Sequence, residues 1–197
     1  MHSLKYICVF CGSSRGIRPE YAEAARALGR AFVRRGLGLV YGGSNVGLMG
    51  AVSSTVLEDG GEVIGIMPEF MRAFEPRADR LSRLIFTETM HVRKAKMAEM
   101  SDAFVALPGG FGTLEELFEI ITHAQIRQHQ KPIGLLNVAG YYDPLLALIG
   151  HAVTEGFVVN GHQALVSSSP DPDHLLDMLE SYQSPDGLER WMNPAEH

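Results

Sequence analysis

The chain alternates short apolar runs rich in β-branched residues with longer segments of helical period, and this alternation limits the fold more than any other feature. Parallel neighbouring strands need a long crossover connection, which a helix usually supplies. We therefore expect an α/β fold in which a parallel sheet is flanked by helices on both faces. The expected strands are 6–10, 38–41, 63–67, 83–86, 103–107, 132–136 and a short one near Leu165, and the expected helices are 20–35, 47–58, 90–100, 114–127, 141–154 and 173–181.

The length of 197 residues suits one sizeable domain, and no long linker divides the chain. We expect that domain to cover residues 1–183, followed by a polar, loosely ordered tail over 184–197. The net charge of −6 argues against nucleic acid or a membrane surface as a partner, because phosphate-rich surfaces attract basic proteins. No early apolar run is long enough to span a bilayer. A cytoplasmic location is therefore expected.

The unusual segments of the sequence follow the expected strands directly. In a doubly wound sheet, ligands bind where the carboxyl ends of the strands meet the turns into the next helices. We therefore expect a ligand at this edge of the sheet. The segments are CGSS (11–14), YGGSNVGLMG (41–50), MPE (67–69), TETMHVRK (87–94) and PGGFGT (108–113).

The glycine-rich segment at 108–113 has two interpretations. Gly109, Gly110 and Gly112 let backbone N–H groups approach an anion at the start of a helix, but they also suit a tight strand-to-helix turn. The second cluster, at 42–50, favours phosphate binding because it follows another strand. Neither cluster is a P-loop, since no Gly-Lys-Ser/Thr follows. Neither matches the dinucleotide fingerprint.

Thr113 and Glu116 have the spacing of a capping box, with threonine at the N-cap and glutamate at N3. On periodicity alone, this structural interpretation of Glu116 is the simpler one. Its place at the ligand edge, beside a glycine turn, favours a functional role instead. The spacing i, i+3, i+4, i+7 predicts that the core face of this helix carries Leu114, Leu117, Phe118 and Ile121.

Two cations, Arg93 and Lys94, share a helical face with apolar residues after the fourth strand, and Thr89 is a candidate N-cap. The cations either pair with carboxylates of the 115–119 region or bind a phosphorylated ligand. The apolar residues on that face are Met90 and Met97.

Cys8 and Cys11 form a C-x-x-C, which can mark a redox pair or half of a zinc site. A zinc site needs further close ligands, and the chain has no other cysteine. Residues three apart on a strand also point to opposite faces. We therefore interpret both as structural thiols, and we interpret His91 and His123 as single histidines outside any metal site.

Two motifs together identify a family. Residues 108–116, PGGFGTLEE, fit PGGxGTxxE, and residues 90–94, MHVRK, fit MHxRK. The chain resembles the cytokinin riboside 5′-monophosphate phosphoribohydrolases, the Lonely Guy family, whose members were often labelled lysine decarboxylases. The resemblance extends over most of the chain through CGSS, GLMG and PIGLLNVAGYYDPLL. The chain departs from the family at Ser44, where a third glycine is common, and at Thr89, where an acidic residue is common.

The family hydrolyses the N-glycosidic bond of N6-substituted AMP, releasing the free base and ribose 5-phosphate, and many bacterial-type relatives resemble AMP nucleosidases. The resemblance implies a Rossmann-like fold, a homodimer with active sites near the interface, a nucleoside monophosphate as the small-molecule partner, and no metal or redox cofactor. It points to Arg93 and Glu116 as the catalytic pair. The residues it places around the substrate are Gly12, Ser13, Gly43, Ser44, Glu75, Met90, Lys94, Gly109, Gly110, Phe111, Gly112, Thr113, Leu114 and Glu115.

Two rival functions deserve comparison. A decarboxylase would need pyridoxal phosphate and a Schiff-base lysine, and of the chain's four lysines only Lys94 lies in a convincing segment. A non-catalytic nucleotide-binding or carrier protein on the same fold would keep the glycines but would need neither Arg93 nor Glu116. The presence of both residues favours an enzyme.

Overall fold

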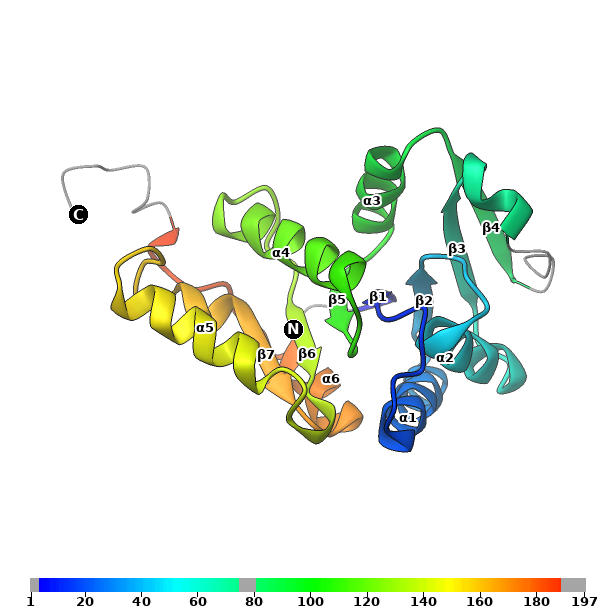
Figure 1. Ribbon diagram of the computed structural model, residues 1–197, viewed down its shortest axis with the longest axis horizontal. Coiled ribbons are helices and arrows are strands. Elements are labelled where there is room, and N and C mark those ends of the chain that lie inside the picture. The colour runs from blue at the N-terminus through cyan, green and yellow to red at the C-terminus, as the bar shows by residue number, and fades with distance from the viewer. Residues whose placement is uncertain (1–3, 75–80, 189–197) are drawn as a thin grey trace.

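The computed structural model describes residues 4–74 and 81–188, which contain a seven-stranded sheet (Figure 1). The order of the strands is β4-β3-β2-β1-β5-β6-β7, and every pair is parallel. The order reverses direction between β1 and β5, where ligand clefts form in such sheets. The strands are β1 (Tyr6–Phe10), β2 (Gly38–Tyr41), β3 (Val63–Pro68), β4 (Arg83–Thr87), β5 (Ala103–Ala106), β6 (Ile133–Leu136) and β7 (Val166–Ser169).

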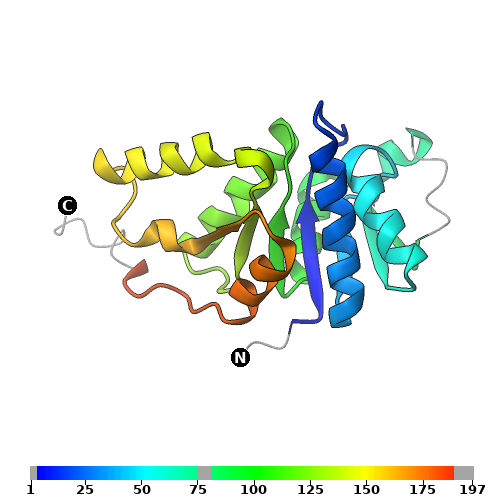
Figure 2. The same cartoon turned by 90° about the horizontal axis from the view of Figure 1, so that it is seen from below.

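Helices cover both faces of the sheet, as the alternating pattern predicts (Figure 1). One face carries α1 (Pro19–Arg35), α2 (Gly47–Glu58) and α6 (Pro172–Glu180), and the other carries α3 (Met90–Glu99) and α4 (Phe111–Gln125). Figure 2 shows α5 (Asp143–Thr154) lying on the side of the molecule toward which β1 points. Short 3₁₀ segments connect these elements, among them η1 (Glu69–Phe74), η3 (Val138–Gly140) and η4 (His162–Leu165).

Two apolar clusters form the core, one on each face of the sheet. Cys11 packs in the cluster with α1 and α2, whereas Cys8 packs in the cluster with α3 and α4. Both thiols are free and buried, and burial raises the pKa of each. The expectation that they point to opposite faces of the sheet is confirmed.

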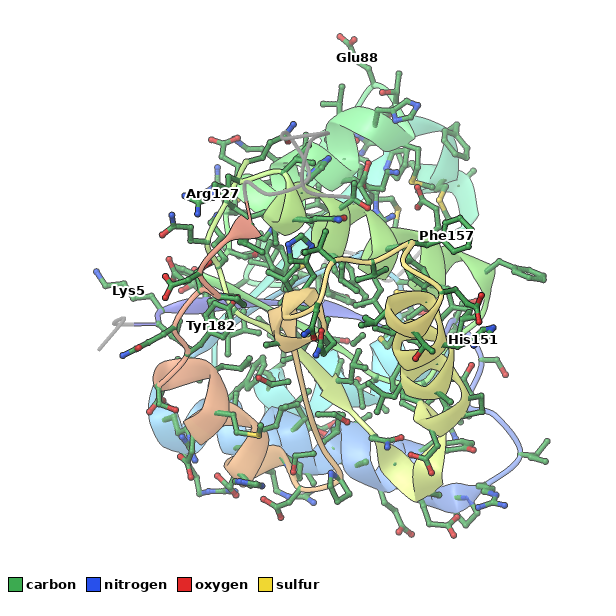
Figure 3. The ribbon with its side chains drawn as sticks, turned by 90° about the vertical axis from the view of Figure 1, so that its left-hand side faces the viewer. Lys5, Glu88, Arg127, His151, Phe157 and Tyr182 are labelled. Carbon is green, nitrogen blue, oxygen red and sulfur yellow. The ribbon has the colours of Figure 1, made fainter. Side chains whose placement is uncertain are left out.

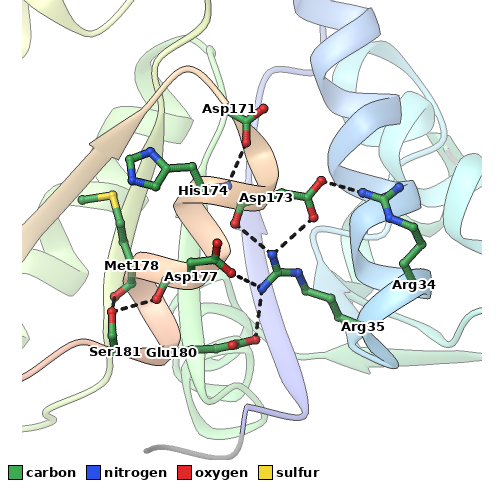
Figure 4. A network of polar contacts seen from close by, with 9 residues as sticks. All are labelled: Arg34, Arg35, Asp171, Asp173, His174, Asp177, Met178, Glu180 and Ser181. Atoms are coloured by element: carbon green, nitrogen blue, oxygen red, sulfur yellow. Dashed lines mark hydrogen bonds and ion pairs between the residues drawn. The ribbon is translucent and has the colours of Figure 1, made fainter.

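A charged network joins the last turn of α1 to α6 (Figure 4). Arg35 forms an ion pair of 2.7 Å with Asp177 and donates to the backbone oxygen of Asp173 at 3.0 Å. Arg34 pairs with the Asp173 carboxylate at 2.6 Å. Figure 4 shows both arginines reaching from α1 toward α6, so this network fixes α6 to the last turn of α1, which precedes the start of β2.

Three expectations need correction or restriction. Helix α4 begins at Phe111, three residues before the predicted start, and Phe118 is 41% exposed. Its fully buried residues are Thr113, Leu117, Ile120 and Ala124, and Leu114 and Ile121 are partly buried against the core. Of the four residues expected on the core face, only Phe118 is misplaced. Leu188, within the segment expected to be loose, is buried in the core, and residues 189–197 lie outside the described part.

Within residues 4–74 and 81–188, no helix is long and apolar enough to cross a membrane. The same residues contain no group of three or more histidine, cysteine, aspartate and glutamate side chains placed to hold a metal ion.

Candidate active site

The first turn of α3 and the second turn of α4 bring Arg93 and Glu116 together at the carboxyl edge of the sheet. Nη1 of Arg93 lies 2.8 Å from Oε1 of Glu116, and their side chains are only 11% and 12% exposed. Nε of Arg93 donates to the backbone oxygen of Ile66 at 3.1 Å, and Nη1 also contacts Sδ of Met90 at 3.2 Å. The guanidinium is therefore held by β3, α3 and α4 at once.

Burial sets the electrostatics of this pair. It raises the pKa of the Glu116 carboxyl above its usual value, while Arg93 acts in the opposite direction through its charge and its hydrogen bond. Such a buried carboxylate next to a single cation is costly in a purely structural role. A carboxylate with a perturbed pKa at the ligand edge of an α/β sheet is typical of a functional site.

Lys94 follows Arg93 directly but reaches different carboxylates. Its ammonium forms an ion pair with Glu115 and a second one, of 3.1 Å, with Glu119. Its side chain is 9% exposed and lines a groove of about 390 Å³ between α3 and α4, together with His123. The pairing of these cations with the carboxylates of α4, which the sequence left as one alternative, is confirmed.

The glycine turn lies in contact with the segment after β1. The N–H of Gly12 donates to the oxygen of Pro108 at 3.1 Å, and a Cβ on Gly12 would lie 3.3 Å from Cα of Gly109. Gly12, Ser13, Gly109 and Gly110 together line a hollow of about 240 Å³, which Arg15 also lines. The structure therefore brings four of the expected substrate residues to one place.

The capping box expected at Thr113 and Glu116 is wrong. Gly110 is the N-cap of α4 and caps it without a side chain, so Thr113 is at N3. The Thr113 side chain is 4% exposed and packs against Gly109, where a Cβ would lie 2.1 Å from Thr113 Oγ1. The glycines allow α4 to begin at Phe111, earlier than the start predicted from an N-cap at Thr113. The N-cap expected at Thr89 is confirmed, since its side chain accepts from the N–H of Val92.

The other expected substrate residues lie in varied surroundings. Phe111 is 94% exposed at the first position of α4, and Gly112 beside it is exposed. Leu114 donates its N–H to Gly110, and its side chain packs with the core. Gly43 has a positive φ of 82°, and a Cβ there would meet Met67.

Ser44 and Glu75 are the remaining residues that the family resemblance places around the substrate. Ser44 is 5% exposed, so it lies beneath the surface of the second glycine segment. Glu75 lies outside the described residues.

Tyr141 and Tyr142, which the sequence did not single out as site residues, contact the glycine turn from the segment before α5. The Tyr141 hydroxyl donates to the oxygen of Gly109, and the Tyr142 hydroxyl donates to the oxygen of Leu107 at 2.7 Å. Their separation of more than thirty residues from that turn left no local signal. Only the three-dimensional arrangement connects them to the site.

The chain is similar to several known proteins. Residues 49–179 match the family model described as possible lysine decarboxylase. A rice protein (Oryza sativa subsp. japonica) named as a probable cytokinin riboside 5′-monophosphate phosphoribohydrolase is 52% identical over 91% of this chain and 73% of its own length. An Arabidopsis thaliana protein with the name cytokinin riboside 5′-monophosphate phosphoribohydrolase is 49% identical over 91% of this chain and 82% of its own length.

The fold also resembles solved structures. The molybdenum cofactor binding protein of the phototrophic bacterium Rippkaea orientalis aligns with a TM-score of 0.66 and 25% identity, over 90% of this chain and 96% of that chain. The expectation of a Rossmann-like parallel α/β fold is confirmed. With the two motifs on adjacent helices and about half of all residues shared with curated relatives over most of its length, the chain belongs to the cytokinin riboside 5′-monophosphate phosphoribohydrolase family.

Proposed function

We propose that this protein hydrolyses the N-glycosidic bond of adenosine 5′-monophosphates, including N6-substituted ones, and releases the free base and ribose 5-phosphate. The observation that carries the proposal is the buried Arg93–Glu116 ion pair of 2.8 Å, one helical turn beyond a glycine turn. The names of the plant relatives support the same reaction. Glycosidic bond cleavage needs a negative charge near the ribose and an anchor for the rest of the substrate.

The glycine turn and the start of α4 suit the 5′-phosphate. The first N–H groups of a helix lack intrahelical partners and carry partial positive charge, so they bind anions. The carboxylates of Glu115 and Glu116 would oppose this, but each is paired with a cation of α3, Lys94 and Arg93 respectively. Phosphate binding therefore remains electrostatically favourable in a protein of net charge −6.

Glu116 suits the other end of the substrate. As the bond between C1′ and the base nitrogen breaks, its electron pair leaves with the base and the ribose gains oxocarbenium character. In our proposal the Glu116 carboxylate stabilises this cation, and Arg93 holds that carboxylate in place. Water then supplies the oxygen that bonds to C1′, and its proton balances the charge on the departing base.

The direct experiment incubates the purified protein with AMP and with N6-isopentenyl-AMP and separates the products by chromatography. We expect equimolar free base and ribose 5-phosphate from at least one of the two. Recovery of both nucleotides intact would contradict the proposal. Binding without turnover would instead indicate the non-catalytic carrier, which is the alternative function on this fold. A visible absorbance that stays with the protein after pyridoxal phosphate is added and the free cofactor is removed would point to the decarboxylase.

We also propose that the protein forms a homodimer through α5. This helix has an apolar sequence, DPLLALIGHAVT, yet none of its residues is fully buried. Leu148 is 58% exposed, and Phe157 just beyond the helix is 87% exposed. Figure 3 shows α5, with His151 and Phe157 labelled, at the outer surface of the molecule. An uncovered apolar helix of this kind is typical of a protein interface, and a second copy matches the homodimer that the family resemblance implies.

Light scattering coupled to size-exclusion chromatography tests the homodimer. We expect a dimer for the wild type and a monomer for Leu148→Glu, because a charge in an apolar interface costs desolvation energy. Phe70→Glu is the matched control: Phe70 is 63% exposed but lies in η1, at the other end of the sheet from α5. A dimeric Leu148→Glu protein, or a monomeric wild type, would contradict this interface.

A further inference from the structure

Three successive carbonyl groups of the glycine turn are each held by a different part of the chain. The oxygen of Leu107 accepts from the Tyr142 hydroxyl at 2.7 Å, and the oxygen of Pro108 accepts from the N–H of Gly12 at 3.1 Å. The oxygen of Gly109 accepts from the Tyr141 hydroxyl. The turn is therefore fixed peptide by peptide, and two of the three contacts come from adjacent tyrosines.

The three contacts have different consequences for the N–H groups of the turn. A trans peptide is planar, so its C=O and the N–H of the next residue point in opposite directions. The bond from Tyr142 orients the peptide between Leu107 and Pro108, which has no N–H because proline lacks one. The bond from Tyr141 orients the peptide between Gly109 and Gly110, whose N–H belongs to Gly110. The bond from the N–H of Gly12 orients the peptide between Pro108 and Gly109 and with it the N–H of Gly109. Of the two tyrosines, only Tyr141 thus sets the direction of an N–H donor.

The Tyr141 ring is held firmly enough to act in this way. It packs edge-on against Tyr21 of α1, with ring centroids 5.9 Å apart, and against Tyr142, with centroids 5.0 Å apart. The segment that carries both tyrosines is held in turn by Asn137, whose side chain accepts from the N–H of Tyr142 at 2.7 Å and donates to Asp143 at 2.7 Å. The hydroxyl is therefore presented by a rigid support.

The peptide between Gly109 and Gly110 needs such a support, because few other contacts fix its orientation. Gly110 has an extended backbone with φ −93° and ψ −156°, and no heavy atom would lie within 4 Å of a Cβ built on it. Packing around its Cα therefore does little to hold this peptide. A glycine peptide is also the one most free to rotate, so its orientation depends on hydrogen bonds to its carbonyl.

We propose that Tyr141 is a positioning residue that keeps the N–H of Gly110 aimed at the substrate's 5′-phosphate by holding the oxygen of Gly109. This inference rests on the proposed function, since it assumes that the glycine turn binds phosphate. Tyr142 supports the same turn without orienting any donor. The two neighbouring tyrosines thus predict different kinetic effects from the same chemical change.

The test compares Tyr141→Phe with the wild type, using AMP as substrate and inorganic phosphate as a competing ligand. Tyr141→Phe keeps the ring contacts and removes only the hydroxyl. We expect KM for AMP and the inhibition constant of inorganic phosphate to rise together by about tenfold, the typical effect of one hydrogen bond to a charged group. We expect kcat at saturating AMP to change less than threefold.

Two matched variants separate positioning from general stability. Tyr142→Phe leaves the buried oxygen of Leu107 without its partner, so we expect a lower melting temperature but an unchanged inhibition constant for phosphate. Tyr6→Phe removes a hydroxyl that donates to Glu62 at 2.7 Å, at the opposite end of β1 from the glycine turn. It should change neither KM for AMP nor the inhibition constant of phosphate.

Two outcomes would overturn the role of Tyr141. One is an unchanged KM and phosphate inhibition constant in Tyr141→Phe, and the other is an equal rise of both in Tyr142→Phe. A wild-type protein that fails to release base from AMP would overturn the proposed function instead. The two failures are therefore distinguishable.

Discussion

A Cβ built on Gly42 would lie 2.3 Å from Nη2 of Arg93. Gly42 follows β2 directly, and its missing side chain leaves the space that the guanidinium occupies. The glycine is thus required for Arg93 to reach both Ile66 and Glu116. From the sequence alone, the place of Gly42 in a glycine-rich segment suggests contact with phosphate. The structure shows a second role, because Gly42 leaves the space that the Arg93 side chain fills.

We therefore predict that Gly42→Ala lowers kcat for AMP by about 10- to 100-fold, because small displacements of a positioned group have effects of that size. A double-mutant cycle with Arg93→Ala provides the measurement. If Gly42 acts through Arg93, adding Gly42→Ala to Arg93→Ala should change kcat less than threefold. Fully multiplicative losses would show that Gly42 acts independently of Arg93.

Gly110→Ala should weaken substrate binding without weakening the fold. The backbone of Gly110 is extended, so an alanine can adopt it, and the new methyl group meets no protein atom within 4 Å. If phosphate binds in that space, KM for AMP should rise about tenfold or more while the melting temperature stays within about 2 °C.

Gly109→Ala is the counterpart, because its Cβ would collide with Thr113. It should lower the melting temperature clearly. Wild-type KM in a folded Gly110→Ala protein would place the phosphate elsewhere.

Arg35→Ala should reduce stability and leave catalysis unchanged. Its side chain is 21% exposed and joins α1 to α6 through Asp173 and Asp177, at the edge opposite the site. Because its partners are largely solvated, we expect the free energy of unfolding in urea to fall by about 1 kcal/mol. Arg34→Ala, at a more exposed position, should cost less. A changed KM for AMP in Arg35→Ala would reveal a connection between α6 and the site.

The pH dependence of kcat/KM should report the Glu116 carboxyl. Activity needs the ionised form, so it should fall as the pH drops through the pKa of Glu116, which burial raises above the usual 4.5. Arg93 lowers this pKa, so Arg93→Ala should move the acid limb to higher pH. The ionisation of the substrate's phosphate is common to both proteins, so the difference between the two profiles comes from the enzyme. An unmoved or downward-shifted limb would contradict this assignment.

The arrangement of strands and helices could be predicted because each element carries its own periodic pattern. The strand bounds agree to within one or two residues, and the edge that carries the site follows from parallel pairing. The start of α4 could not be predicted, since three glycines near Phe111 offer no side-chain cap and permit either an earlier or a later start. The misplaced start then produced the wrong capping box.

Contacts between residues far apart in the sequence could not be predicted either. The sequence offered pairing with Glu116 as one possible role of Arg93, but only packing of α3 beside α4 decides which carboxylate each cation meets. The contact between Tyr141 and Gly109 depends on the fold of the segment before α5, where Ala139 has a positive φ of 51°. Such backbone conformations carry little signal in a single sequence.

The most direct measurement of the central claim is AMP hydrolysis by Glu116→Gln, with thermal unfolding recorded on the same preparation. The amide keeps the shape and an oxygen that can accept from Arg93, but it removes the charge that we assign to stabilising the ribosyl cation. Glu99→Gln is the control, because Glu99 pairs with Lys96 on the exposed end of α3. We predict cooperative unfolding in both variants, wild-type turnover for Glu99→Gln, and a kcat lowered by about 10²–10⁴ for Glu116→Gln. A folded Glu116→Gln protein that keeps most of its turnover would contradict the account, because the buried pair would then have no part in cleaving the glycosidic bond.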